Sequence, residues 1–242
     1  MLKIDLHIHT VASRHAFNTM LEYINKAKEL KMDMIGFSEH GPANKSTLAD
    51  NSYFECMPRL PQSVDGIRIL KGVEANIIGG KDLIDINKKI EERLDYIMAG
   101  FHFGAPYIDQ GKEKNTELLI KVIRSGKVDI ITHPFNTKFF DIDIEKISEV
   151  ACENDVFLEL NISYIKKGVE RNIPEFIEKA KKMIAIVKKN NKKLILGSDA
   201  HNIWELADDS IIQEKKNELG LTDDMIINNH SEELLKQLNV KE

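Results

Sequence analysis

The chain has 242 residues, of which 42% are hydrophobic and 30% charged, an ordinary composition for a globular protein with a sizeable core. Its formal net charge of −5 argues against broad nucleic-acid binding, which relies on a basic surface, so nucleic acid is an unlikely partner. Its two cysteines, Cys56 and Cys152, imply no disulfide framework. With no signal-peptide pattern and no apolar run of about 18 residues, we expect a cytoplasmic protein without a membrane partner.

Short apolar runs alternate with amphipathic patterns along the chain. Most runs are rich in β-branched or aromatic residues and apolar on both faces, as in a parallel sheet that is covered on both sides. The predicted strands are residues 2–6, 34–37, 67–73, 96–101, 128–132, 156–160 and 194–196. Because helical connections separate them, the pattern predicts right-handed βα units, which can close into a barrel or remain an open doubly wound sheet.

Helix signals stand between these runs. Thr19 and Glu22 form a capping box for a helix that extends to about Leu30, and Gly126 is expected to end a later helix. The other predicted helix starts are Asn115 or Thr116, Asp143, Pro174 and Ser231. Residues 41–65 and 104–114 are expected to be irregular loops with a functional role. Since no linker, low-complexity tract or repeat interrupts the pattern, we expect residues 1–242 to form a single domain.

Seven of the eight histidines stand at or just past the end of a predicted strand. They are His7, His9, His15, His40, His102, His133 and His201. Residues i and i+2 of a strand point to the same side, so the His7/His9 pair and the Asp199/His201 pair can each reach one cation. If the sheet closes, these pairs meet at one mouth, and Glu74, directly after the third run, adds a carboxylate there.

Any one of these histidines alone could be a hydrogen-bonded residue at a strand terminus, and for His133 that alternative is as good as ligation. Together, imidazoles with interspersed carboxylates are typical ligands of zinc, manganese or iron. A structural zinc site is closed with about four ligands. Seven histidines with Glu74 and Asp199 exceed that number, so the pattern predicts two or three ions.

The strand-end motifs resemble those of the PHP superfamily, named for polymerases and histidinol phosphatases, and are most similar to YcdX-type phosphatases. The motifs are Asp5-Leu6-His7-Ile8-His9-Thr10, His15, Glu39-His40-Gly41-Pro42, Gly72-Val73-Glu74-Ala75-Asn76, Ala99-Gly100-Phe101-His102, Thr132-His133-Pro134 and Gly197-Ser198-Asp199-Ala200-His201. The resemblance implies a distorted seven-stranded (βα)7 TIM-like barrel with a trinuclear metal site. Glu39 departs from the Asp that is usual before the histidine, which concerns the surroundings of the site rather than its ligands.

The resemblance also implies a distribution of ligands over three divalent ions, with Zn²⁺ as the first choice and Mn²⁺ or Fe²⁺ as alternatives. The first ion would take His7, His9, Glu74 and Asp199. The second would share Glu74 and add His102 and His133, and the third would take His15, His40 and His201. We assign the catalytic roles to Glu74, Asp199 and His201.

The predicted activity is hydrolysis of small phosphomonoesters by a metal-bound hydroxide, since bound metal lowers the pKa of water to about 7. Alternatives are a histidinol-phosphate phosphatase, a PHP phosphodiesterase or exonuclease, a metal-dependent amidohydrolase, and a metal-stabilised binding module without enzymatic activity. Arg14 and Lys138 are either phosphate contacts or solvated surface charges. Asn161 is expected to be a turn residue that bonds the backbone. The physiological substrate and the oligomeric state stay open.

Overall fold

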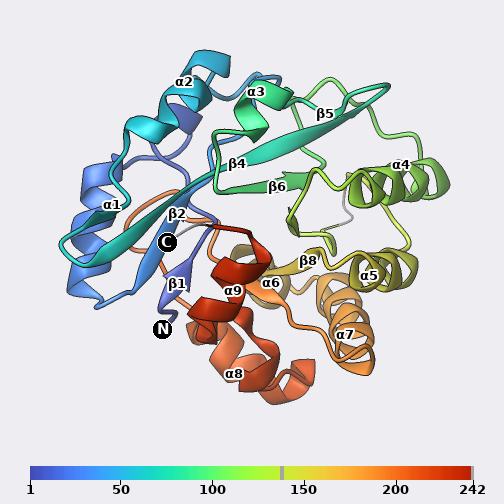
Figure 1. Cartoon of the computed structure of the whole chain (residues 1–242). Helices are drawn as coiled ribbons and strands as arrows, with labels where there is room; N and C mark the ends of the chain where they lie inside the picture. The colour runs from blue at the N-terminus through green and yellow to red at the C-terminus, as the bar shows by residue number, and fades with distance from the viewer. Residues whose placement is uncertain (137–138, 241–242) are drawn as a thin grey trace.

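The computed structural model describes residues 1–136 and 139–240. Its centre is a nearly closed barrel of seven parallel strands, each paired with the next in chain order (Figure 1). The strands are β1 (Ile4–Asp5), β2 (Met34–Phe37), β4 (Ile67–Gly79), β6 (Tyr96–Gly100), β7 (Ile130–Ile131), β8 (Phe157–Asn161) and β9 (Ile195–Gly197). Two short strands, β3 (Ser63–Val64) and β5 (Leu83–Ile84), pair antiparallel with β4 outside this path. The predicted seven-stranded α/β barrel is confirmed.

The first and last strands meet at both ends of the barrel, which decides between a closed and an open sheet. Just past the strand ends, the His9 N–H donates to the Ala200 carbonyl over 2.9 Å, within a parallel bridge between Ile8 and Ala200. At the amino ends, the Asn228 side chain donates to the carbonyls of Ile4 and Leu196 over 2.9 and 2.8 Å. Asn228 Oδ1 also accepts from the Leu196 N–H over 2.8 Å, so one side chain bridges β1 and β9.

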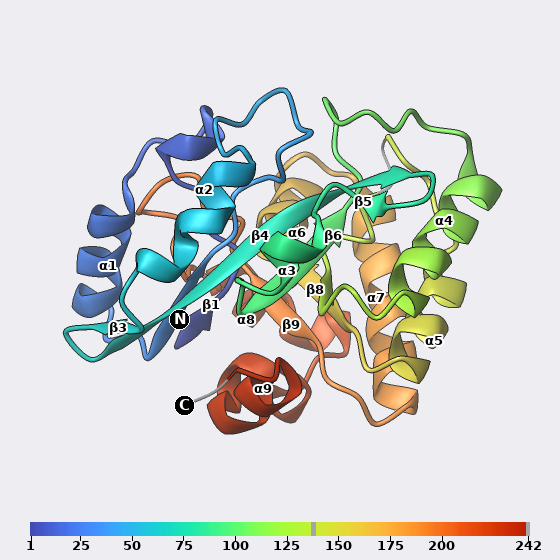
Figure 2. The same ribbon diagram turned by 45° about the horizontal axis from the view of Figure 1, so that its top comes forward.

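Helices cover the outside of the barrel, and one of them closes the end at which the amino ends of the strands lie (Figures 1 and 2). The helices that lie between strands or after the last one are α1 (Met20–Glu29), α3 (Lys88–Glu91), α4 (Lys112–Arg124), α5 (Ile144–Glu153), the consecutive pair α6 (Ile162–Glu170) and α7 (Pro174–Lys189), and α8 (Ser210–Leu219). The last helix, α9 (Ser231–Gln237), packs Leu234 and Leu238 against side chains from inside the barrel. The interior of the barrel is thereby filled at its amino end, and the carboxyl ends of the strands, where barrel enzymes build their sites, stay open. Within the described residues, no helix has the length and apolar character that crossing a membrane requires.

The barrel interior is filled by one large side chain at a position where two strands carry glycine. Tyr96 is buried, and its hydroxyl donates to the Leu6 carbonyl over 2.6 Å. A Cβ atom on Gly72 would lie 2.1 Å from Tyr96 Cζ, and one on Gly36 would lie 2.4 Å from the hydroxyl oxygen. Because neither glycine carries a Cβ atom, β2 and β4 can approach the ring of Tyr96 closely.

Several predicted boundaries were wrong. β4 continues past Val73 to Gly79, because residues 74–76 pair with β6 and Ile77 and Gly79 pair with β5, so Glu74 lies inside the strand rather than after it. α4 begins at Lys112, three residues before Asn115, whose side chain instead donates to Asp109 and to the Asp141 carbonyl. The cap of α9 is His230, and Ser231 is already its first residue.

Other local predictions held, and some elements were missed. The Thr19 capping box is present, and Asp143 caps α5. Residues 41–65 are less irregular than expected, because they contain α2 (Asn51–Cys56), a 3₁₀ turn at Met57–Arg59 and β3. The sequence reading also did not identify α3, α6 and α8.

Candidate metal centre

Glu74 lies at the middle of a buried cluster of imidazoles at the carboxyl ends of the strands. It belongs to β4, and a parallel bridge sets it beside His40 at the end of β2. Its Oε1 lies 2.9 Å from Nε2 of His102 and 2.9 Å from Nε2 of His133. The same oxygen is 3.3 Å from His7 Nε2. Its Oε2 lies 2.9 Å from His40 Nδ1 and 3.4 Å from His9 Nε2, so five imidazoles surround one carboxylate.

Asp199 forms the second carboxylate of the cluster. Its Oδ1 is 3.5 Å from His7 Nε2 and 3.3 Å from His9 Nε2, and His201 Nδ1 lies 3.6 Å away. Asp199 has a φ of 57° and His133 a φ of 34°, the left-handed region that residues with a Cβ rarely adopt. Such strain persists where the surroundings hold it, and it concentrates at functional sites.

The cluster contains three overlapping groups of three residues. Within each group, one ligand atom from every residue lies within 4.8 Å of those of the other two. They are His7 with His9 and Glu74, His40 with Glu74 and His102, and His9 with His40 and His201. The exposed His15 stands at the outer edge, with its ring centroid 4.7 Å from that of His201 and 5.3 Å from that of His40. All nine predicted ligands thus surround one basin. Their distribution over individual ions remains a prediction.

Hydrogen bonds behind the cluster orient its imidazoles. The His7 Nδ1–H donates to Glu159 Oε1 over 2.5 Å, and the His102 Nδ1–H donates to Asn76 Oδ1 over 2.9 Å. The His201 Nδ1–H donates to the Asp199 carbonyl over 2.8 Å. Since these partners accept, the neutral form of each ring has its proton on Nδ1 and its lone pair on Nε2, as a metal ligand requires.

A third carboxylate stands behind His9. The ring Nδ1 of His9 is 3.2 Å from Ser13 Oγ, which donates to Glu39, and Glu39 also accepts from the Thr10 amide over 2.9 Å. Because the Ser13 proton is directed at Glu39, the His9 ring must donate through Nδ1, and its Nε2 remains free. Glu39 therefore positions His9 and stays out of the basin, as the sequence predicted.

Glu159 and Asn76 are the residues that sequence reasoning missed. Glu159 is buried, and besides binding His7 it accepts from the His133 N–H over 2.8 Å and from Asn161 Nδ2 over 3.1 Å. A Cβ on Gly197 of β9 would lie 2.0 Å from Glu159 Oε1, so glycine is required to make room for this carboxylate. A signal was available, because Glu159 is the one charged residue in the apolar run 156–160.

The charges in the cluster are strongly coupled. Burial by itself would raise the pKa of Glu74, but His102, His7 and His40 hold it well below its usual range. Burial would likewise raise the pKa of Asp199, and His7, His9 and His201 lower it. The pKa of His9 is lowered by burial and by His40, which favours the neutral, metal-binding form of its ring.

Two buried polar atoms show that the residues suit a cation. His40 Nδ1 and Glu74 Oε2 lie 2.9 Å apart, yet neither has a hydrogen-bond partner among the described residues. An unpaired buried polar atom is costly, whereas a cation between ring nitrogen and carboxylate oxygen satisfies both. Imidazole nitrogens with carboxylate oxygens are also the donor set that zinc, manganese and iron accept.

The remaining predicted candidates have different positions. Asn161 caps α6 by accepting from the Tyr164 N–H over 3.0 Å, which is the backbone role expected of it, and its Nδ2 also lies 3.5 Å from Asp199 Oδ2. Arg14 is exposed and ends the 3₁₀ turn Val11–Ser13. Lys138 lies outside the described residues.

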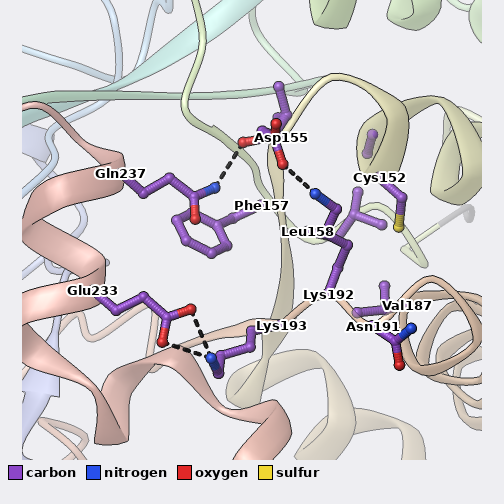
Figure 3. Close-up of a pocket in the computed structure, with 12 residues that line it drawn as sticks. Cys152, Asp155, Phe157, Leu158, Val187, Asn191, Lys192, Lys193, Glu233 and Gln237 are labelled. Atoms are coloured by element: carbon purple, nitrogen blue, oxygen red, sulfur yellow. Dashed lines mark hydrogen bonds and ion pairs between the residues drawn. The ribbon is translucent and has the colours of Figure 1, made fainter.

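A cavity of about 210 Å³ lies away from the metal centre, beside the amino ends of β8 and β9 (Figure 3). Lys193 Nζ lies 2.6 Å from Glu233 of α9, and Lys192 pairs with Asp155. Since both cations already have carboxylate partners, this cavity does not fit an anionic substrate.

Comparisons with known proteins agree with the geometry. Residues 5–194 match the family described as PHP domain. A protein named probable phosphatase, from Proteus mirabilis (strain HI4320), is 36% identical over 239 residues, which cover 97% of this chain and 93% of that protein. The predicted enzyme class, a phosphatase, agrees with the name of this relative.

Solved structures with low identity share the fold. Histidinol phosphate phosphatase from Lactococcus lactis, complexed with zinc, L-histidinol and phosphate, has a TM-score of 0.60 at 15% identity and covers 90% of this chain and 94% of that one. A chain of archaeal ribonuclease P with mature tRNA has a TM-score of 0.60 at 18% identity and covers 98% and 88%. The match of residues 5–194, together with the Proteus mirabilis relative, shows that this chain belongs to the PHP domain family.

Proposed function

We propose that this chain is a metal-dependent phosphatase that hydrolyses small phosphomonoesters at a centre of three divalent cations. The observation that carries the proposal is the position of Glu74, whose two oxygens face different sets of imidazoles within 3.4 Å. A carboxylate so placed can bridge neighbouring cations, as hydrolytic sites with two or more metals require. The nine ligands are those predicted from the sequence, and Zn²⁺ is the first choice, with Mn²⁺ or Fe²⁺ as alternatives.

Divalent cations at this centre would act as Lewis acids and supply hydroxide near neutral pH, so no Ser, Cys or Asp nucleophile is needed. The chain contributes orientation and charge. Glu159, Asn76 and Ser13 keep three imidazoles in the ligating tautomer. Glu74, Asp199 and Glu159 together carry fewer negative charges than three dications carry positive ones, and the surplus attracts a phosphate dianion to an acidic protein.

Asp199 and His201 lie on the open side of the basin. Their side chains are 12% and 25% exposed, whereas Glu74 is 1% exposed. A substrate that enters from the mouth would therefore meet Asp199 and His201 first, and Glu74 would lie beneath the phosphoryl group. This difference in exposure supports a role for Glu74 in holding the cations from below and roles for Asp199 and His201 on the substrate side.

The experiment is metal removal and reconstitution of the full chain. Treatment with a chelator should abolish hydrolysis of p-nitrophenyl phosphate, and Zn²⁺, Mn²⁺ or Fe²⁺ should restore it, with close to three ions bound per chain. The His9→Ala variant should lose activity and bound metal. His230→Ala is the matched control, because His230 lies at the start of α9 at the opposite end of the barrel. Full activity in metal-free protein would refute the proposal.

A substrate panel then distinguishes the alternatives. It contains p-nitrophenyl phosphate, sugar phosphates, histidinol phosphate and a short oligonucleotide, all with the reconstituted protein. We expect turnover of the phosphomonoesters and little trimming of the oligonucleotide. Preference for histidinol phosphate would narrow the function to that substrate, and preference for the oligonucleotide would replace the phosphatase by a nuclease.

A further inference from the structure

Tyr164 lies beside the metal centre but is not among its ligands. Its ring centroid is 5.3 Å from that of His133. Its N–H donates to Asn161 Oδ1 at the start of α6, and Asn161 Nδ2 in turn donates to Glu159 Oε2 over 3.1 Å. The backbone of Tyr164 is therefore linked, through Asn161, to Glu159, the carboxylate that also binds His7 and His133.

The phenol of Tyr164 is suited to donate a hydrogen bond to an anion. The side chain is half-buried. A phenol has an ordinary pKa of about 10, so the hydroxyl carries a proton to donate at neutral pH. A neutral donor can approach a phosphoryl oxygen without repelling the cations.

Lys167 is placed on the same side of α6 as Tyr164. The two residues are three positions apart on the helix, and Lys167 Nζ lies 4.5 Å from the centroid of the tyrosine ring. In residues 1–136 and 139–240, no carboxylate is within ion-pair distance of this ammonium. Lys26, Lys89 and Lys193, by contrast, each contact a glutamate. The charge of Lys167 is thus held against the ring of Tyr164, which itself neighbours His133 of the centre.

Among residues 1–136 and 139–240, the metal cluster contains no lysine or arginine. Within the described part of the chain, its carboxylates Glu74, Asp199 and Glu159 form close contacts with histidines but no ion pair with a permanent cation. We propose that Tyr164 and Lys167 form a phosphate-binding arm, in which the Tyr164 hydroxyl donates to a phosphoryl oxygen and the Lys167 ammonium balances the charge of the phosphate. The inference rests on the proposed function, because it assigns substrate contacts to the same basin.

The arm is tested with inorganic phosphate as the probe, on the zinc-reconstituted full chain. Tyr164→Phe and Lys167→Met should each raise the inhibition constant for phosphate, and the KM for p-nitrophenyl phosphate, about tenfold, because each removes one contact to a charged group. Lys166→Met is the matched control, since Lys166 is the exposed neighbour on the same helix. It should leave both constants unchanged.

Metal content and melting temperature separate substrate binding from structural support. Both should match the wild type in Tyr164→Phe and Lys167→Met. An unchanged inhibition constant in both variants would overturn the arm, as would an equal effect of Lys166→Met, which would reveal only a general surface charge. Loss of metal from Tyr164→Phe would show that Tyr164 acts by supporting His133, which also overturns it.

The arm and the proposed function fail in different ways. If the wild type hydrolyses no phosphomonoester, the proposed function fails, and isothermal titration of the zinc-loaded protein with phosphate still measures the arm. If the wild type is active and the variants bind phosphate as tightly as it does, only the arm is wrong.

Discussion

Individual side chains behind the ligands determine whether the histidines can bind metal at all. Glu159 accepts hydrogen bonds from the His7 ring, the His133 backbone and the Asn161 side chain. All three groups donate, so both oxygens of the Glu159 carboxylate act as hydrogen-bond acceptors. A buried carboxylate in this position orients two candidate ligands at once and adds negative charge next to the cations.

Replacing Glu159 with Gln should weaken metal binding by about 10- to 100-fold. The amide is of nearly the same size, but its NH₂ group would face one of the donors, and the charge is lost. Competition with a chromophoric chelator measures the affinity. Glu153→Gln, on the exposed end of α5, is the control and should bind metal as the wild type does. Equal affinities of Glu159→Gln and wild type would show that the carboxylate has no influence on the ions.

Two aspartates, each directly before a strand, bind the backbone of the preceding strand in the barrel. Asp95, directly before β6, accepts from the Lys71 N–H of β4 over 2.8 Å. Asp129, directly before β7, accepts from the Ile97 N–H of β6 over 2.8 Å. In both cases the aspartate carboxylate satisfies a backbone N–H of the preceding strand, just before the regular hydrogen bonding between the two strands begins.

Asp129 should make stability depend on pH. Burial raises its pKa to about 6, above the ordinary value of 3.8. A raised carboxyl pKa means that ionisation costs more in the folded state, so the penalty is absent below pH 3.8, develops between pH 3.8 and 6, and is complete above pH 6. Asp129→Asn keeps the acceptor for Ile97 and removes the charge.

We therefore expect Asp129→Asn to be within about 0.5 kcal/mol of the wild type at pH 4 and about 3 kcal/mol more stable at pH 7. Urea denaturation of both proteins at several pH values gives the difference in the free energy of unfolding, in which the contributions of the other groups cancel. A difference that does not change with pH would refute the assignment.

At the scale of the whole molecule, the metal centre depends on closure of the barrel. His7 and His9 follow the first strand and Asp199 and His201 the last, so the two pairs meet only if β1 and β9 are adjacent. Backbone bonds around Ala200 join them at the mouth, and Asn228 joins them at the opposite end. The last helix then covers the amino end of the barrel with Leu234 and Leu238.

Asn228→Ala should lower the free energy of unfolding by about 3 kcal/mol, because it leaves a buried N–H and two buried carbonyls without their partner. Chemical denaturation measures this loss. Asn229→Ala is the matched control, since the neighbouring side chain donates only to the Asp223 carbonyl near the surface, and should cost less than about 1 kcal/mol. Equal losses in the two variants would show that the bridge between β1 and β9 stabilises the fold no more than a hydrogen bond near the surface does.

Much of this molecule is encoded locally. The strands were recognisable because β-branched and aromatic runs that are apolar on both faces suit only a covered parallel sheet. The histidines were recognisable because they recur at strand ends, and parallel strands bring such ends to one rim. The capping box at Thr19 was readable because its hydrogen bonds join residues three positions apart.

Other features depend on contacts between distant parts of the chain. The extension of β4 past Glu74 requires its pairing first with β6 and then with β5, and the shift of α4 follows from the use of Asn115 to hold Asp109 and the Asp141 carbonyl. Glu159 gained its role from His7, 152 residues away in sequence. By itself the sequence determined which residue types reach the mouth of the barrel, because strand periodicity is local. Only the tertiary structure decided which atoms meet there, because the partners of a buried polar group are chosen by packing across the barrel.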